Sequence, residues 1–117
     1  MFALTLMLLA TSPVAPIAAT LDQPVTLRRS EAATHEKVIV IFTSVVSDSR
    51  CPPDVQCKWA GKVVVRLTAS VVRGKPVIRE LSLEPGRPAP SFEFEGYRVT
   101  LVSVESPPES VTLKLSR

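Results

Sequence analysis

The sequence predicts an all-β fold, an antiparallel β-sandwich or barrel of six to seven strands. Apolar and polar residues alternate in several short segments, which is the pattern of a half-buried strand. Turn-forming Gly and Pro residues separate these segments at short intervals, and no stretch after the first twenty residues shows a helical period. Strands that follow one another closely along the chain are typical of antiparallel sandwiches and barrels.

The first half of the domain is expected to contribute two strands. Residues 24–29 form the first, and the polar residues 30–36 connect it to the next. Residues 37–46 are rich in β-branched side chains and carry apolar residues on both faces, which favours a central strand.

Residues 62–84 are predicted to form a hairpin. From residue 63 onward the chain alternates strictly, with one set of positions apolar: Val63, Val65, Leu67, Ala69 and Val71. Residues 73–76 are a tight polar turn, and the returning strand points Leu81 and Leu83 inward.

The last third supplies three further strands. Residues 85–90 form a loop, because three of the six are prolines without a backbone donor. Phe92 and Phe94 alternate with glutamates, and Glu95-Gly96 is either a two-residue turn or a bulge before a strand over 97–104. A final strand follows the proline pair at 107–108, with its inward positions at 111, 113 and 115.

The chain of 117 residues begins with an apolar, uncharged segment. Residues 1–19 are expected to be an export signal, cleaved after Ala19, and residues 20–117 a single domain of ordinary size. The apolar run is about half of the ~20 residues that a membrane-spanning helix needs, so no stable membrane span is predicted.

The charge distribution argues against a nucleic-acid binder. There are 14 basic and 11 acidic residues, giving a formal net charge of +3, and the two signs are interspersed. Nucleic-acid proteins cluster cations and add aromatic rings for stacking, whereas only 5% of this chain is aromatic.

The two cysteines, Cys51 and Cys57, lie six positions apart. In an exported chain such a pair most simply forms one disulfide. The alternative, a reduced pair that binds metal, has no second pair of ligands to support it. We therefore predict no metal and no cofactor.

The segment around the cysteines is the most distinctive in the chain. Pro52 and Pro53 restrict the loop that the disulfide would close, so the loop is expected to be rigid. The string DSRCP, a short gap and then QCKWAG, followed by a valine-rich strand and a late GYRVTL strand, resembles short exported bacterial proteins, often lipoproteins, of unassigned function. The resemblance covers residues from about 42 onward. It implies a bacterial, periplasmic or secreted location, although this chain lacks the leader cysteine of lipid-anchored members.

Each notable residue of this segment has two interpretations. Trp59 either packs over the disulfide as core or exposes its ring to a ligand. Asp48 and Arg50 either cap and brace a turn, which is favoured, or form a charged binding spot. Gly61 marks a bulge or a close approach at the start of the strand.

An enzyme is not predicted. His35, the one histidine, is expected to be solvated in a loop, with no nucleophile and orienting group beside it. Glu93 and Glu95 alternate with phenylalanines as a solvent face would, so they are not a catalytic pair.

Three functions remain. The favoured one is a noncatalytic binding or accessory domain of the bacterial envelope, with an envelope protein or a small ligand as partner. Its candidate surface is formed by Asp48, Arg50, Pro52, Pro53, Asp54 and Trp59. The alternatives are a protease inhibitor that presents the disulfide-held loop, and a purely structural domain.

Overall fold

The computed structural model describes residues 16–51, 61–106 and 108–117, and within these ranges the chain forms nine strands and no helix. The strands are β1 Ile17–Ala18, β2 Pro24–Arg28, β3 Ala32–His35, β4 Val38–Asp48, β5 Val63–Val71, β6 Val77–Leu83, β7 Ser91–Phe94, β8 Tyr97–Glu105 and β9 Ser110–Ser116. Residues 16–51, 61–106 and 108–117 therefore contain no candidate for a membrane-spanning helix.

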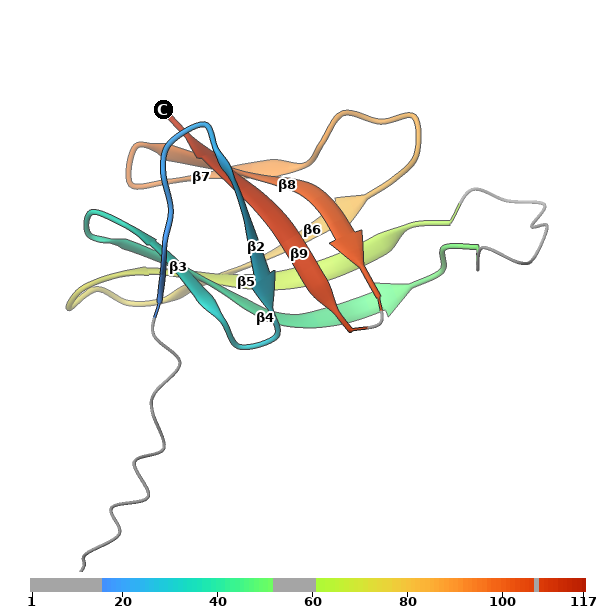
Figure 1. Cartoon of the computed structure of the whole chain (residues 1–117), viewed down its shortest axis with the longest axis horizontal. Coiled ribbons are helices and arrows are strands. Elements are labelled where there is room, and N and C mark those ends of the chain that lie inside the picture. The colour runs from blue at the N-terminus through green and yellow to red at the C-terminus, as the bar shows by residue number, and fades with distance from the viewer. Residues whose placement is uncertain (1–15, 52–60, 107) are drawn as a thin grey trace, which may run out of the picture.

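The strands form two stacked sheets, so the fold is a sandwich and not a closed barrel (Figure 1). One sheet has five strands in the order β1-β3-β4-β5-β6, and the other has four in the order β2-β9-β8-β7. The prediction of an all-β fold is confirmed, and of the two predicted architectures, sandwich and barrel, the chain forms the sandwich. Six to seven strands were predicted and nine are present in the described ranges; the segments predicted as strands are all found, and the two short strands β1 and β3 were not predicted.

The five-stranded sheet is mixed, which corrects the prediction of a purely antiparallel fold. β1 runs parallel to β3, and every other pair of strands is antiparallel. The predicted polar connection over residues 30–36 was wrong, because it contains β3. This strand lacks apolar alternation, and pairing with β4 across the Glu36-Lys37 turn holds it in the sheet.

β1 lies within the segment predicted to be the export signal. Ala19, directly after β1, is buried and donates its backbone N–H to the carbonyl of Thr34 at 2.7 Å. The predicted cleavage point after Ala19 therefore lies inside the folded part of this chain. The rest of the predicted signal, residues 1–15, lies outside the described residues.

The core fills the space between the two sheets. Of the five alternating positions predicted for β5, four are fully buried, namely Val63, Val65, Leu67 and Ala69, and the fifth, Val71 at the end of the strand, is partly buried. They face the inward residues of the second sheet, chiefly Leu27, Val99, Leu101, Val111, Leu113 and Leu115. Interdigitation of two such faces is the main source of stability in a β-sandwich.

β4 is central in its sheet, between β3 and β5, as predicted. Two register shifts interrupt its pairing with β5, one between Phe42 and Ser44 and one between Val45 and Ser47. Bulges of this kind bend a strand and increase its twist. The second half of β4 therefore leaves the regular alternation and carries Asp48 to the edge of the sandwich.

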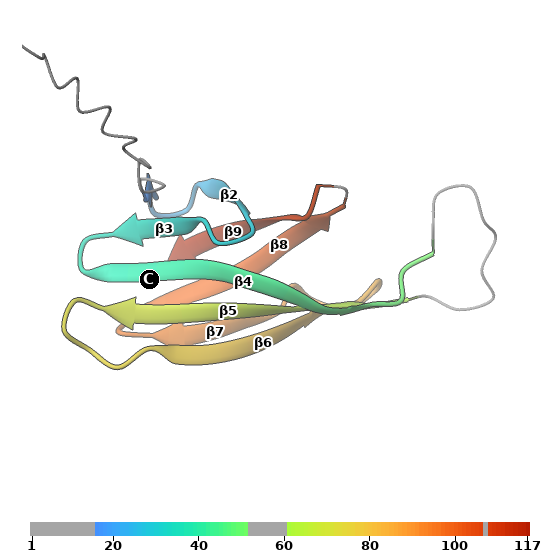
Figure 2. The same ribbon diagram turned by 90° about the horizontal axis from the view of Figure 1, so that it is seen from below.

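The Glu95-Gly96 pair is a two-residue turn, which settles the alternative that the sequence left open. Phe94 pairs directly with Tyr97, and both turn residues have positive φ, 52° and 81°. Two consecutive positive φ values match the type I′ turn that fits the twist of paired strands. This turn lies at the same end as the β3–β4 and β5–β6 turns, and the β8–β9 turn lies at the opposite end (Figure 2).

Candidate functional site

The predicted site residues fall partly within the described chain. Asp48 ends β4, and Arg50 and Cys51 follow it directly. Pro52, Pro53, Asp54, Cys57 and Trp59 lie outside the described residues. The disulfide between Cys51 and Cys57 and the packing of Trp59 therefore stay predictions.

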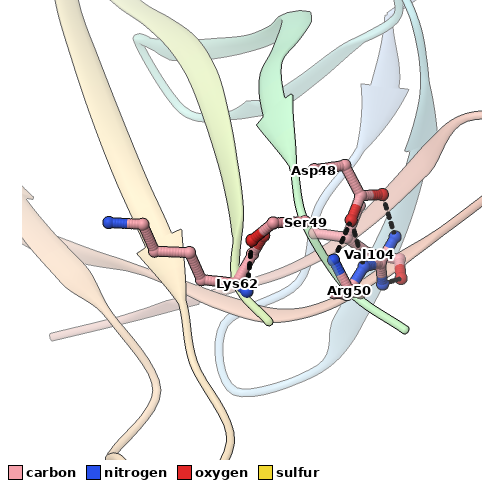
Figure 3. Close-up of polar contacts among 5 residues, drawn as sticks. All are labelled: Asp48, Ser49, Arg50, Lys62 and Val104. Atoms are coloured by element: carbon pink, nitrogen blue, oxygen red, sulfur yellow. Dashed lines mark hydrogen bonds and ion pairs between the residues drawn. The ribbon is translucent and has the colours of Figure 1, made fainter. Parts of the chain in front are cut away.

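Arg50 ties the end of β4 to the second sheet (Figure 3). Its Nε and Nη2 donate to the two carboxylate oxygens of Asp48 at 3.0 and 2.8 Å, and its Nη1 donates to the carbonyl of Val104 on β8 at 2.6 Å. The backbone N–H of Arg50 also donates to Asp48 Oδ1, at 3.0 Å. A planar guanidinium can satisfy all these acceptors at once.

This arrangement is the bracing interpretation of the pair, the one that the sequence favoured. Both side chains are about one-third exposed, at 32% for Arg50 and 33% for Asp48, so they line the surface without being free to reorient. The hydrogen bonds from Arg50 lower the pKa of Asp48, and Asp48 in turn raises the pKa of Arg50. The ion pair therefore fixes the geometry of this end of the sandwich.

A second set of contacts joins the two residues that flank the cysteine segment, Ser49 before it and Lys62 after it. Ser49 donates its backbone N–H to the carbonyl of Lys62 at 2.8 Å, and the backbone N–H of Lys62 donates to Ser49 Oγ at 3.0 Å (Figure 3). Gly61 lies where the two backbones meet, so close that a Cβ there would overlap the carbonyl group of Ser49. Of the two roles predicted for Gly61, the structure shows a close approach of backbones.

A pocket of about 930 Å³ opens beside the Asp48–Arg50 pair. The end of β4, the β8–β9 turn and the outer end of β2 contribute its walls, and its polar lining includes Thr26, Arg28, Asp48, Arg50, Glu105, Ser106 and Ser110. Of these, the sequence singled out only Asp48 and Arg50. No local motif marks the others, because strands that are far apart in sequence bring them together.

The other end of the sandwich holds a polar cluster that sequence reasoning missed. Tyr97 donates its hydroxyl to Glu36 Oε2 at 2.6 Å, which lowers the pKa of Glu36. Arg117 donates to the Tyr97 hydroxyl at 3.0 Å and lies over the tyrosine ring, 5.2 Å from its centre. These contacts tie β9 and the β3–β4 turn to β8.

His35 belongs to this cluster, which corrects its prediction as a solvated loop residue. It ends β3, its Nδ1 lies 2.9 Å from the carbonyl oxygen of Ala19, and its ring meets Tyr97 edge-on. No local pattern around His35 indicates this role, because Ala19 and Tyr97 are both distant from it along the chain. His35 is thus a structural residue that fastens β1 to the sandwich.

The contribution of the Asp48–Arg50 pair to the free energy of unfolding is expected to depend on pH, because folding lowers the pKa of Asp48. A carboxyl whose pKa is lowered by folding stabilises the protein above its unfolded-state pKa, and that share is lost as the pH falls through the folded-state pKa. Asp48→Asn should lower the free energy of unfolding at pH 7 by about 0.5–1 kcal/mol, because solvent screens the pair. The difference from the unaltered protein should vanish well below the ordinary Asp pKa of 3.8.

Chemical denaturation at a series of pH values measures this difference. Glu93→Gln is the matched control, because it removes an ion pair with Arg98 whose side chains are 77% and 58% exposed. That change should cost less than about 0.5 kcal/mol at pH 7. A difference for Asp48→Asn that is constant from pH 7 to pH 2 contradicts the prediction.

Comparison with known proteins finds no family model that matches the chain, no similar curated protein and no similar solved structure. Among the described residues, no group of three or more His, Cys, Asp or Glu side chains is placed to hold a metal ion. Functional inference therefore rests on the geometry of the chain itself.

Proposed function

We propose that this protein is a noncatalytic binding domain of the bacterial envelope, and that its recognition surface is the end of the sandwich where β4 leaves the sheet. The observation that carries the proposal is the 930 Å³ pocket at this end, lined by both signs of charge and by hydroxyl groups. Ligand sites are concave and use a few convergent polar groups to orient what they bind.

The rigidity of the pocket supports this role. Arg50 joins the end of β4 to the backbone of β8, so two walls of the pocket are held at a fixed separation. The hydrogen bond between Ser49 and Lys62 holds the two flanks of the cysteine segment together beside the pocket. A wall that is ordered before binding lowers the entropic cost of binding.

The extracytoplasmic part of the proposal rests on the apolar leader and on the cysteine pair. Fractionation of a bacterium that expresses the whole chain with a carboxy-terminal tag should place the protein in the periplasm or the medium. Mass spectrometry of that protein should find no free thiol. Two free thiols, or a chain retained in the cytoplasm, would contradict the location.

Amide chemical-shift mapping tests the recognition surface. The labelled protein is titrated with separate probes, namely an amino acid, a short peptide, a disaccharide and a nucleoside monophosphate. At least one probe should shift amides of residues 48–51, 104–106, 109 and 110 and leave the opposite end, around Glu95 and Gly96, unchanged. Shifts confined to that opposite end, or none from any probe, would overturn the proposal.

The protease-inhibitor alternative makes a separate prediction for the same protein. An inhibitor should slow serine, cysteine and metalloproteases at a one-to-one ratio, whereas the proposed binding domain should leave every rate unchanged. Stoichiometric inhibition of any one of them would favour the alternative.

A further inference from the structure

Two charged side chains in the pocket have no polar partner within the described ranges. The guanidinium of Arg28 and the carboxylate of Glu105 make no hydrogen bond or ion pair there. The backbone N–H of Arg28 donates to the carboxylate oxygen Oε1 of Glu31 at 2.6 Å, and the guanidinium of Arg28 takes no part in that contact. By contrast, the guanidinium of Arg50 donates hydrogen bonds to the carboxylate of Asp48 and to the carbonyl of Val104.

The register of the four-stranded sheet aligns these two charges. Arg28 on β2 pairs directly with Ser110 on β9, and Ser110 pairs directly with Glu105 on β8. Directly paired residues of antiparallel strands point to the same face of the sheet. Adjacent strands are about 4.8 Å apart, so the backbones of Arg28 and Glu105 are separated by roughly 10 Å, with Ser110 between them.

The same face is the outward one. Leu27, Val104 and Val111, which are the chain neighbours of these three residues, point into the core. Alternation along each strand therefore turns Arg28, Ser110 and Glu105 toward solvent and into the pocket. A cation, a hydroxyl and an anion thus lie in one row.

The balance of charge selects the ligand class. Asp48 and Arg50 neutralise each other, which leaves one positive and one negative group for a ligand. A ligand with a single charge would be attracted by one of them and repelled by the other. A ligand with both charges satisfies both groups, which is the complementarity that gives specificity to polar sites.

We propose that this pocket binds a small zwitterion of the peptide class, with its carboxylate on Arg28 and its ammonium group on Glu105. An extended dipeptide is about 7 Å long. This length fits between the charged groups of Arg28 and Glu105 when the two side chains lean toward each other, because their backbones are roughly 10 Å apart. The inference rests on the proposed function, since it names the ligand class of that same surface.

The test compares three probes that differ only in their end charges. Ala-Ala carries both charges, N-acetyl-Ala-Ala only the negative one, and Ala-Ala amide only the positive one. Titration into the labelled protein should shift the amides of Ser106 and Ser110. Each capped probe should bind about fivefold more weakly than Ala-Ala, because contacts between exposed charges contribute little each.

Variants assign each charge to its partner. Arg28→Gln should weaken Ala-Ala about fivefold and remove the advantage of a free carboxylate, and Glu105→Gln should do the same for the free ammonium group. Arg98→Gln is the matched control, because Arg98 lies on an exposed position of the same sheet, outside the pocket. It should leave the affinity unchanged.

The outcomes separate the two proposals. If all three probes shift Ser106 and Ser110 with equal affinity, or if Arg28→Gln and Glu105→Gln bind Ala-Ala as the unaltered protein does, the zwitterion inference fails while the recognition surface stands. If the three probes shift no amide at this end, the zwitterion inference fails as well. In these titrations the proposed recognition surface is contradicted only if the chemically different probes also leave this end unchanged.

Discussion

Gly61→Ala is expected to destabilise the protein by about 3 kcal/mol or more, because the added methyl group overlaps backbone atoms. Its Cβ would overlap the carbonyl group of Ser49 and lie 2.6 Å from the Cα of Arg50. The change therefore forces residues 49–50 away from the start of β5. The hydrogen bonds between Ser49 and Lys62, and those that Arg50 makes to Asp48 and Val104, should be lost together.

Chemical denaturation of Gly61→Ala measures the loss, and Gly86→Ala is its matched control. Gly86 has a positive φ of 76°, but no atom lies within 4 Å of where its Cβ would be. That control should cost only about 1 kcal/mol, from backbone conformation alone. A second substitution, Ser49→Gly, should not rescue Gly61→Ala, because the overlapping atoms are backbone. Equal losses for the two glycine variants would contradict the close-approach explanation.

Phe42→Ala is expected to cost about 3–5 kcal/mol, a large share of the stability of a domain of this size. Phe42 is fully buried and lies where the pairing of β4 with β5 first shifts. Its removal leaves a cavity between the two sheets, in a region that two bulges already make irregular. The midpoint of thermal unfolding should fall by roughly 15 °C or more.

The control for this change is Val72→Ala. Val72 is 69% exposed, so the loss of its side chain should change the free energy of unfolding by less than about 0.5 kcal/mol. Phe42→Leu keeps most of the volume and should recover more than half of the loss. A thermal midpoint of Phe42→Ala within 3 °C of the unaltered protein would show that the interior is not packed as described.

The strands with regular alternation could be predicted from the sequence alone. β5 is the clearest case, since Val63, Val65, Leu67 and Ala69 were predicted to point inward and are fully buried. β9 follows the same rule with Val111, Leu113 and Leu115. This succeeds because the period of two is a local property: each residue faces one side of its own strand whatever its neighbours are.

The elements that were missed have no such local signal. β3 contains Ala33 at a buried position, but its remaining residues are not apolar enough to show alternation. β1 has only two residues, and it is a strand because it pairs with the edge strand β3. Both depend on pairing partners, which a single segment of sequence does not reveal.

The candidate site divides in the same way. Asp48 and Arg50 are two residues apart and form part of a turn, so their bracing role could be expected from composition and spacing. Arg28 is far along the chain from Glu105 and Ser110, which face each other across the β8–β9 turn, and none of the three stands in a distinctive motif. Their row is created by the register of β2, β9 and β8.

The amino-acid sequence by itself determined that the chain is all-β, where seven strands run and which side chains of the regular strands are buried. It did so because hydrophobic alternation and turn chemistry act over a few residues. Tertiary structure alone decided the mixed sheet, the close approach at Gly61 and the row of opposite charges in the pocket. Those features arise from hydrogen bonds between strands that are distant in the chain, and the free energy that selects them appears only when the two sheets pack together.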